Sequence, residues 1–516
     1  MFTTFDCVIV GSGHAGSCAA MSAVEGGSKH VLVVEKSPKD WVGGNGYFTA
    51  GAHRTVHGGV KDLLRIVQNV SEEVATTIDI EPYSAEEFIG DIMRLGDNQS
   101  DPAIVQAVVE GSSDAVQWLA DSIQVPFTLA FNRQAYLVNG RQKFWGGMAL
   151  SVEDGGKGLI RAHQQALEKA GVEVWFDTPA VELVVDSNSC IAGLIVLHNG
   201  ERLLLSTPAV ILACGGFESS TELRAKNLGQ EWTHAKVRGT PYNTGDGIAL
   251  AQAIGAKVAG DFAGCHSTCW DANAPPDRGD RALSNQFTKS GYPLGIMLNA
   301  LGRRFVDEGE DFRNYTYAKF GREILRQPGG FVFQVWDSRT VDWLRNEEYG
   351  DELVEKIWAQ SVSQLAEKLS SKGLQDTREF IYTIESYNSA VRAFQLENAS
   401  LEWDPAIKDG LSSESSTTSL QPPKSNWALP IEQPPLLAVK VACGITFTFG
   451  GLAISPDTAG VISSRTDKPI VGLFCTGELV GGLFFKNYPG GSGLTAGAVF
   501  GRKAGHAAAA LSLRNS

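Results

Sequence analysis

The chain has no CxxC or CxxCH motif and no dense array of cysteines, which excludes the usual zinc, c-type haem and iron–sulfur ligand sets. Its cysteines are scattered, and most lie in apolar runs: Cys7, Cys18, Cys190, Cys214, Cys265, Cys269, Cys443 and Cys475. Cys265 and Cys269 flank His266 in "CHSTC", but this spacing is unusual for zinc and no fourth ligand is apparent. We therefore predict no metal site, and reduced, buried thiols in an intracellular protein.

Positive charge is also in deficit. The sequence has 44 Lys and Arg against 58 Asp and Glu, a formal net charge of −14. Proteins that bind nucleic acid or acidic membranes carry basic patches, so the balance argues against both kinds of partner. It would also repel small anions at long range, and an anionic substrate would depend on a local cluster of cations.

Long apolar runs are absent. No window approaches the roughly 18 apolar residues that a membrane span needs. The first residues, "MFTTFDCVIVG", show no charged leader region or cleavage site. We therefore expect a soluble, cytoplasmic protein without a membrane span. Its 516 residues predict two or more domains, and a composition of 43% hydrophobic residues is enough to bury a large core.

The first sixty residues contain a dinucleotide-binding motif. "CVIV", "GSGHAG" and "VLVVE" predict a strand, a glycine-rich turn that opens a helix, and a second strand that ends at Glu35. Gly11 permits the tight turn, Gly13 lets the backbone approach a pyrophosphate, and Gly16 lets helix and strand pack closely. Glu35 would accept hydrogen bonds from ribose hydroxyls. The alternative, a glycine turn in an α/β unit without a ligand, does not explain this combination.

Further glycine-rich stretches favour FAD over NAD. "VGGNGYFTAGAHR" (42–54) follows the second strand, where an NAD-binding unit would continue with a helix. "PGGSGLTAGAVFGRKAG" (489–505) opens a helix whose N-terminus suits the electron-rich edge of a reduced flavin. "PAVILACGGFESS" (208–220) and "NTGDGIALAQAIGA" (243–256) add two more turns. Both ends of the chain are thus predicted to surround one long ligand.

Together these motifs resemble, in order and over nearly the whole chain, the fumarate reductase/succinate dehydrogenase flavoprotein superfamily. The resemblance implies an α/β fold, with a Rossmann-like FAD-binding domain of the glutathione-reductase type formed by residues 1–260 and 441–516. An α+β capping domain would be inserted at 261–440. "CHSTCWDANAPP", "GRRFVDEGEDFRNYTYAKFGRE" and "CGITFTFGGL" are most similar to the tricarballylate dehydrogenase branch, which is implied to oxidise tricarballylate to cis-aconitate with FAD.

The resemblance also implies which residues bind FAD. They are Gly11, Gly13, His14, Ala15, Gly16, Glu35, Lys36, Gly44, Asn45, Thr49, Ala50, Gly51, Val181, Ala213, Gly215, Thr244, Asp246, Glu478, Gly491, Ser492 and Leu494. Asn45 stands where the succinate dehydrogenases carry the histidine that attaches the flavin. We therefore predict non-covalent FAD.

Three stretches predict local structure outside these motifs. Residues 377–398 have apolar residues near helical spacing and predict an amphipathic helix of the cap. Residues 172–205 alternate strand-like runs with polar turns, which predicts a small antiparallel meander. Residues 410–435 are rich in Ser, Thr and Pro and predict an exposed excursion.

Arg313 is the main candidate on the substrate side. Dehydrogenation of a saturated acid removes a proton from one carbon and a hydride from its neighbour, so the carboxylate must be clamped. Arginine matches a carboxylate bidentately, and the resemblance implies that Arg313 also carries the proton. Because a free guanidinium stays charged, this transfer needs a neighbour such as Glu308, Glu310 or Asp311. Alternatively, Arg313 only neutralises these acids on a surface turn.

Other residues complete the expected site. The resemblance implies that His266 binds a substrate carboxylate. Tyr315 and Tyr317 alternate around Thr316, so one could face the site while the other packs; Tyr315 is our catalytic candidate beside Arg313 and His266. Thr446 is a candidate substrate contact.

The chain departs from the fumarate reductases where those enzymes hold a dicarboxylate with an arginine and a histidine. Here these positions read Tyr488 and Phe447, so that clamp is not expected, and Tyr488 becomes a substrate-contact candidate. The candidate replacements for the clamp are four cations, each of which could instead be a solvated surface charge: Arg54, Lys486, Arg141 and Lys143.

Three functions remain open at this point. The first is an FAD-dependent dehydrogenase that forms a C=C bond beside a carboxylate, with a tricarballylate-like polycarboxylate as reference substrate. The second is an ene-reductase acting on an activated alkene in a biosynthetic pathway. The third, a non-enzymatic escort of prenylated proteins with the same fold, is disfavoured by the intact glycine motif and Glu35. An enzyme of either kind would exchange electrons with a separate protein, a quinone or dioxygen.

Overall fold

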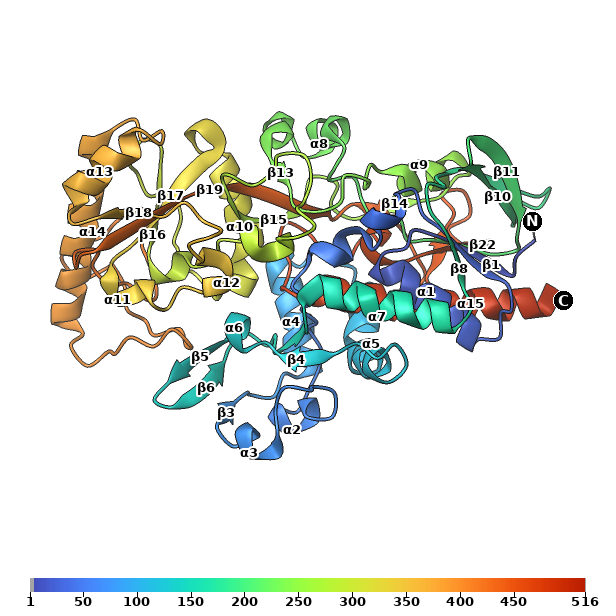
Figure 1. Cartoon of the computed structure of the whole chain (residues 1–516), viewed down its shortest axis with the longest axis horizontal. Coiled ribbons are helices and arrows are strands. Elements are labelled where there is room, and N and C mark those ends of the chain that lie inside the picture. The colour runs from blue at the N-terminus through green and yellow to red at the C-terminus, as the bar shows by residue number, and fades with distance from the viewer. Residues whose placement is uncertain (1–3, 516) are drawn as a thin grey trace.

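The computed structural model describes residues 4–515 and is an elongated molecule with both termini at one end (Figure 1). The lobe at that end is built on a six-stranded sheet in the order β21-β22-β12-β1-β2-β8. Every pairing in it is parallel except that of β21 with β22. The strands are β1 (Cys7–Val10), β2 (Val31–Val34), β8 (Glu173–Trp175), β12 (Val210–Leu212), β21 (Gly460–Ile462) and β22 (Pro469–Cys475). All residues of β1, β2 and β12 are buried, as in a parallel sheet covered on both faces.

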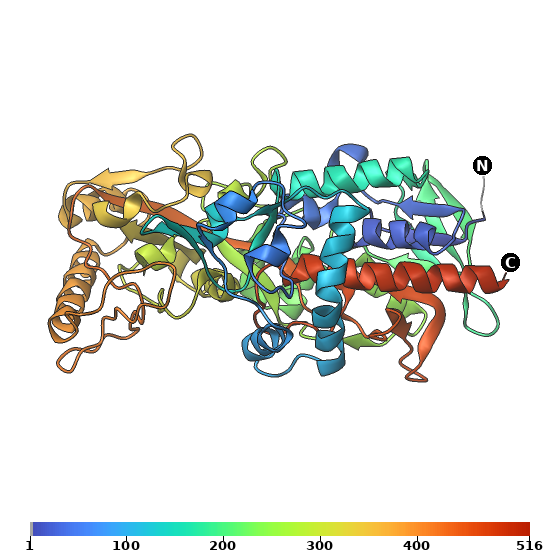
Figure 2. The same cartoon turned by 90° about the horizontal axis from the view of Figure 1, so that it is seen from below.

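Two helices from opposite ends of the chain pack against each other beside this sheet. They are α1 (His14–Glu25) and α15 (Ser492–Asn515), and they lie side by side in both views (Figures 1 and 2). Small residues form the contact: a Cβ built on Gly505 would lie 2.3 Å from the carbonyl oxygen of Ala19. The two chain ends therefore form one unit, as predicted.

The meander predicted for residues 172–205 is confirmed from Ala180 onward, whereas Glu173–Trp175 instead form β8 of the six-stranded sheet. Strands β9 (Ala180–Val185), β10 (Ile191–His198) and β11 (Glu201–Ser206) form an antiparallel sheet in the order β11-β10-β9.

The opposite lobe is organised by the long strand β19 (Leu436–Thr448). Its partners are β13 (Lys236–Val237), β15 (Cys265–Asp271), β17 (Phe331–Trp336) and β18 (Ile357–Ala359), and β16 (Ile296–Asn299) pairs with β17. The boundary predicted at 440/441 falls inside β19, so the two lobes share a strand there (Figure 1). The division into 1–260 plus 441–516 and 261–440 stays a prediction.

Helices cover this second sheet, and one of them was expected. Helix α14 (Thr377–Glu397) confirms the predicted amphipathic helix. The others are α10 (Arg313–Leu325), α11 (Ser338–Val341), α12 (Asn346–Tyr349) and α13 (Val362–Ser370).

Residues 410–435 contain no helix or strand, but the expectation of an exposed excursion is wrong in part. Trp427, Ala428 and Ile431 are buried, and the buried Lys424 ammonium donates to the carbonyl oxygens of Pro293 and Gly295 at 2.8 and 2.6 Å.

A third group of elements lies at the junction of the two lobes and extends below it in Figure 1. It comprises α2 (Val60–Leu63), α3 (Glu72–Ala75), β3 (Ile78–Asp79), α4 (Ala85–Leu95), α5 (Pro102–Asp121), β4 (Phe127–Leu129), α6 (Phe131–Gln134), β5 (Ala135–Val138), β6 (Arg141–Phe144) and β7 (Leu150–Val152). The remaining helices and strands are α7 (Gly155–Lys169), α8 (Thr221–Asn227), α9 (Asp246–Ala253), β14 (Val258–Ala259) and β20 (Gly451–Leu452). Within residues 4–515, no helix combines the length and apolar character required to cross a membrane.

Candidate active site

A long cavity runs from the glycine turn after β1 to the base of the second lobe. Both chain ends line it, as do the ends of β2 and β12, the 44–52 loop, and residues of β15, α10 and β19. Most of its wall thus comes from segments far apart in the sequence, which the parallel sheet and β19 bring together.

The glycine turn has the geometry that its sequence predicts. Gly11 has a φ of +110°, and a Cβ there would lie 2.5 Å from the carbonyl oxygen of Ala213. A Cβ on Gly16 would lie 2.0 Å from the carbonyl oxygen of Gly11, so only glycine allows this approach of helix and strand. A Cβ built on Gly13 would be 3.6 Å from its nearest neighbouring atom, so the backbone at Gly13 is open toward the cavity. No side chain caps the start of α1, which leaves its N–H groups free for an anion.

Glu35 closes the same end of the cavity from the end of β2. It is buried, and its carboxylate accepts hydrogen bonds from the Ser12 amide at 2.8 Å, the Ser12 hydroxyl at 2.7 Å and the Ser37 amide at 2.8 Å. The neighbouring Lys36 ammonium is 2.7 Å from an Asp246 oxygen and donates to the Thr244 hydroxyl at 2.6 Å. Lys36 therefore ties β2 to the start of α9.

A pair of acids, Glu478 in the cavity wall and the buried Glu218 behind it, lies next to Asn45. Asn45 donates to Glu218 at 2.5 Å and to the carbonyl oxygen of Thr446 at 2.6 Å, and Glu478 accepts the Thr448 amide at 2.7 Å. Burial and the adjacent Glu478 raise the pKa of Glu218 well above its usual value, and burial raises the pKa of Glu478 as well. Both shifts favour the protonated form of the pair.

At the other end of the cavity, Arg313 opens α10. It is 6% exposed, its guanidinium donates to the Ser290 hydroxyl at 2.7 Å, and it lies 5.0 Å from the ring centre of Trp145. No carboxylate among residues 4–515 lies within ion-pair distance of it. The acids that precede it are paired elsewhere: Glu308 with Arg304, Glu310 with Lys319, and Asp311 with Arg94 and Lys408. The alternative in which Arg313 neutralises these acids on a surface turn is therefore wrong.

A second unpaired arginine, Arg238, lines the cavity just after β13. It is 8% exposed and donates to the Thr446 hydroxyl at 3.1 Å and to the Asn285 side-chain oxygen at 3.2 Å. Burial lowers its pKa below the usual value. Like Arg313, it has no carboxylate partner in the described part of the chain, so both cations face the cavity uncompensated.

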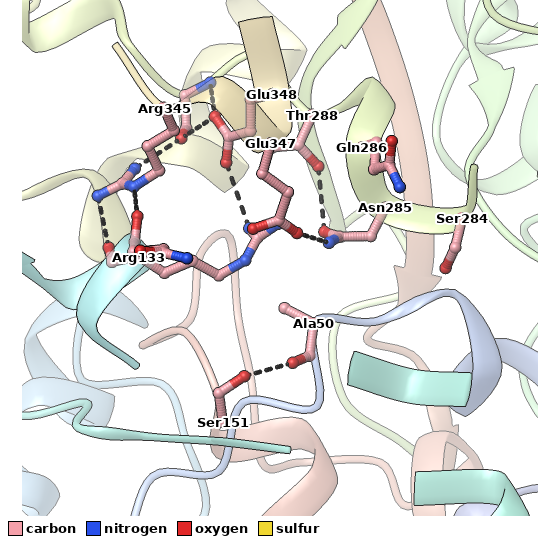
Figure 3. A network of polar contacts seen from close by, with 12 residues as sticks. Ala50, Arg133, Ser151, Ser284, Asn285, Gln286, Thr288, Arg345, Glu347 and Glu348 are labelled. Atoms are coloured by element: carbon pink, nitrogen blue, oxygen red, sulfur yellow. Dashed lines mark hydrogen bonds and ion pairs between the residues drawn. The ribbon is translucent and has the colours of Figure 1, made fainter. Parts of the chain in front are cut away.

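A third lining arginine, Arg133, differs because it is already paired. It comes from α6 and lies 2.6 Å from Glu347 and 3.2 Å from Glu348 (Figure 3). Asn285 approaches Glu347 at 3.4 Å on its other side. These groups also border a second, outer cavity that shares Thr49, Ala50, Arg133 and Asn285 with the first.

Ser290 connects Arg313 to Glu348. The Ser290 hydroxyl accepts from Arg313 and donates to Glu348 at 2.5 Å, and the Ser290 amide donates to the same carboxylate at 2.9 Å. Burial would raise the pKa of Glu348, but the Arg133 and Arg345 guanidiniums and the bonds from Ser290 hold it below its usual value. The site therefore contains an ionised carboxylate linked to Arg313 through one hydroxyl.

Aromatic side chains form the remaining wall. The His266 ring lies 4.6 Å from that of Tyr317, 4.7 Å from Tyr488 and 5.6 Å from Phe447, measured between ring centres. The Tyr317 and Tyr488 hydroxyls are 2.7 Å apart. Burial and the Arg238 charge lower the pKa of His266 well below its usual value, so the imidazole is neutral.

A model of the FAD binding domain matches residues 6–494. The chain belongs to this family. It is 28% identical to the probable fumarate reductase Ifc3 of Shewanella frigidimarina (strain NCIMB 400) over 512 residues, which is 98% of this chain and 75% of that protein. It is also 28% identical to a urocanate reductase of Eggerthella lenta over 526 residues, 99% of this chain and 75% of the relative.

A solved structure supports the same assignment. The open conformation of a flavocytochrome c3 fumarate reductase superposes with a TM-score of 0.70 at 26% identity, over 99% of this chain and 79% of that one. The predicted fold class and superfamily are confirmed; the tricarballylate branch is not shown. The chain is an FAD-dependent oxidoreductase of the kind that acts on carbon–carbon bonds.

The cavity of this flavoprotein fits FAD, because its glycine turn, acid and two helix N-termini are arranged along one channel. Most of the residues predicted to bind FAD line it: Gly11, Gly13, His14, Ala15, Glu35, Lys36, Gly44, Asn45, Thr49, Ala50, Ala213, Gly215, Asp246, Glu478, Gly491 and Leu494. Five do not. Gly16 and Gly51 serve close packing, Thr244 supports Lys36, the Ser492 hydroxyl donates to the Pro489 carbonyl oxygen, and Ala180 lines the cavity in place of Val181.

His14 shows how the flavoprotein joins its chain ends. One ring nitrogen is 2.9 Å from the Leu494 carbonyl oxygen and the other is 2.9 Å from His163. Burial lowers the pKa of His14 to about 4. His14, Cys18 and His163 are close enough to hold a metal, but both nitrogens of His14 are already engaged. We assign no metal there.

Several substrate-side expectations need correction. Tyr315 does not line the cavity: its hydroxyl donates to Asp91 at 2.6 Å, and the buried Arg54 donates to it at 3.3 Å. Tyr317 faces the cavity instead. Arg54 belongs to this separate network, 3.7 Å from Asp91, and is also absent from the cavity wall.

The other candidate cations lie elsewhere. Lys486 pairs with Asp97 on the surface, Arg141 with Asp79, and Lys143 with Asp404. His266, Thr446 and Tyr488 do line the cavity, as expected. Sequence reasoning missed Arg238, Arg133, Ser290 and Glu348. For Arg238 the position directly before a Gly-Thr-Pro turn and the "NTGDG" motif was a usable signal, but nothing local marks the other three.

Proposed function

We propose that this flavoenzyme oxidises or reduces the carbon–carbon bond next to a carboxylate. The observation that supports this is the pair of buried arginines, Arg238 and Arg313, that face the cavity without a carboxylate partner. Burying a cation without a counterion is costly. An organic acid that enters the cavity would supply the missing charge, and two planar guanidiniums would fix its orientation.

FAD bound in this cavity supplies the two-electron chemistry, and the 489–494 turn and α15 would hold it beside the arginines. The protein's own side chains carry out the other part of the reaction, which is the transfer of a proton to or from a substrate carbon. In the oxidative direction, Arg313 takes a proton from the substrate carbon as one of its N–H protons passes through the Ser290 hydroxyl to Glu348. In reduction, Glu348 first takes up a proton from water, and the protons then move in the opposite order, from Glu348 through the Ser290 hydroxyl to Arg313 and from Arg313 to the substrate carbon. This relay replaces the acids Glu308, Glu310 and Asp311 of the sequence hypothesis.

The names of the relatives support one direction of the reaction. Both relatives described above are named as reductases of unsaturated acids, which supports reduction of a 2-enoate. Oxidation of a tricarballylate-like polycarboxylate, the substrate class expected from the sequence, is the second candidate. In either direction we propose a separate electron donor or acceptor.

The test is the anaerobic reoxidation of dithionite-reduced holoenzyme by a panel of 2-enoates, followed by the flavin absorbance. We expect Arg313→Lys and Arg238→Met each to slow the reaction at least about 100-fold, because each removes part of the clamp. Glu348→Gln should slow it about 10- to 100-fold by blocking the relay. Arg141→Met is the control, since Arg141 is exposed and pairs with Asp79. Reaction of Arg313→Lys and Arg238→Met at the wild-type rate would exclude the proposal.

A further inference from the structure

We infer that the acid accepted by this site has a carboxylate at one end and an aromatic or similarly flat, unsaturated ring at the other. The 3-arylpropenoates and their saturated counterparts form such a class. This inference rests on the proposed function and narrows its substrate class. It excludes compact di- and tricarboxylates as the preferred ligands.

The first argument is an aromatic stretch of the cavity wall. Side chains from β15, α10, the end of β19 and the residue after it, and the segment before α15 line the cavity there: His266, Tyr317, Phe447, Phe449, Phe484 and Tyr488. The Tyr488 ring lies 5.1 Å from Phe447 and 5.2 Å from Phe484 between centres. Aromatic rings prefer such edge-to-face neighbours, so this aromatic wall would favour a further ring over a charged group.

The second argument is charge. His266 is neutral, and burial raises the pKa of both Tyr317 and Tyr488, so their phenols stay protonated. The two hydroxyls also bond to each other. No member of the aromatic wall is therefore ionised, so none of these side chains can pair with a carboxylate. If Arg238 already binds one carboxylate, a second carboxylate placed against this wall would be desolvated without a counterion of its own, which is costly.

The third argument is the number of free cations. Arg133 lines the cavity but is neutralised by Glu347 and Glu348. Among the residues that the structure describes, Arg238 and Arg313 are then the arginines that line the cavity and have no acidic partner. Two guanidiniums can bind the two oxygens of one carboxylate, and then no unpaired arginine is left for a second one.

The spacing of the two ends fits such a ligand. Arg313 and Tyr317 are four residues apart on α10 and both line the cavity. About one helical turn separates them, a rise of roughly 6 Å over four residues. A short chain of two carbons between a carboxylate and a ring spans a distance of this order. A single face of α10 would thus contact both ends of the acid.

The test compares equilibrium binding of 3-phenylpropenoate (cinnamate), fumarate and cis-aconitate to the oxidised, FAD-loaded enzyme by calorimetry. Binding is measured without turnover, so it does not depend on catalytic activity. We expect cinnamate to bind at least about 10-fold more tightly than either polycarboxylate, a difference of about 1.4 kcal/mol. Tighter binding of fumarate or cis-aconitate to the wild-type protein would overturn the inference and leave the arginine clamp intact.

Variants of the aromatic wall test whether ring contacts cause this preference for cinnamate. Phe447→Leu should weaken cinnamate about 5- to 10-fold and leave fumarate unchanged, whereas Tyr488→Phe should retain cinnamate binding. Tyr488→Arg should reverse the preference toward fumarate. The flavin content of each variant checks that it has folded. Equal effects of Phe447→Leu on all three acids would contradict a ring contact. Failure of every acid to bind the wild-type enzyme would instead exclude the proposed function itself.

Discussion

At the scale of single residues, the flavin side and the substrate side of the cavity differ in whether their charged side chains have protein partners that balance the charge. Glu35, Lys36 and Asn45 already have protein partners, so their positions are set before a ligand arrives. Arg238 and Arg313 have only neutral partners on the substrate side. The cofactor cradle is thus preorganised, and the substrate site retains uncompensated charge for its ligand.

Asn45 leads to a prediction about attachment of the cofactor. Its amide bonds to Glu218, the Thr446 carbonyl oxygen and the Thr240 amide, and it offers no nucleophile for a covalent link. We expect acid precipitation of the holoenzyme to release all of the FAD into the supernatant, measured by its absorbance and fluorescence. Flavin that stays with the protein pellet, or with a peptide after proteolysis, would contradict non-covalent binding.

The Glu218–Glu478 pair leads to a prediction about pH. Because the pKa of Glu218 is raised in the folded protein, the folded state binds more protons than the unfolded state above about pH 4.3. The free energy of unfolding should therefore fall as pH rises from that value through the raised pKa. Glu218→Gln should make this slope shallower by up to about 1.4 kcal/mol per pH unit in urea titrations between pH 5 and 8.

The control for this experiment is Glu168→Gln, because Glu168 is exposed on α7. Its slope should match that of the wild-type protein. A Glu218→Gln variant with an unchanged slope would show that the pair does not hold the proton.

Chemistry explains which site residues can be recognised in the sequence and which cannot. The glycine motif and Glu35 are recognisable because a dinucleotide needs fixed residue types at fixed spacings along one segment. Arg238, Arg133 and Glu348 come from three separate segments that only tertiary structure brings together. A guanidinium in such a place looks like any other charged residue in the sequence.

At the scale of elements, α10 explains the error over Tyr315. In the sequence the two tyrosines alternate around Thr316, and this pattern alone allows either of them to face the site. Because α10 begins at Arg313, the side chain four residues later lies on the same face, and the one two residues later points away. Tyr317 therefore joins Arg313 in the cavity wall, and Tyr315 bonds to Asp91.

The α1–α15 contact leads to a prediction about two glycines. A Cβ on Gly505 would lie 2.3 Å from the Ala19 carbonyl oxygen, so Gly505→Ala must push α15 away from α1. We expect a lower melting temperature, equivalent to a loss of about 1–3 kcal/mol, and faster loss of FAD. The matched control is Gly90→Ala in α4, where nothing lies within 4 Å and the better helix propensity should stabilise by up to about 1 kcal/mol. Equal melting temperatures for the two variants would contradict this account of the packing.

At the scale of the whole molecule, the substrate end of the cavity is assembled from three parts of the fold. Arg313 and His266 come from the lobe built on β19, Tyr488 from the C-terminal segment, and Arg133 from the group of elements at the junction of the lobes. The sequence resemblance predicted the two-lobed plan, because its motifs occur in order along the chain. It did not predict the contribution of residues 57–152, whose segment carries no recognisable motif.

The central claim is that Arg238 and Arg313 together hold one carboxylate in the FAD-binding cavity. The most direct measurement is a crystal structure of the FAD-loaded enzyme with cinnamate bound. The account predicts both carboxylate oxygens within hydrogen-bonding distance of the two guanidiniums, and the ring against Tyr317 and Phe447. A carboxylate out of reach of both arginines, or guanidiniums turned out to bulk water, would contradict it.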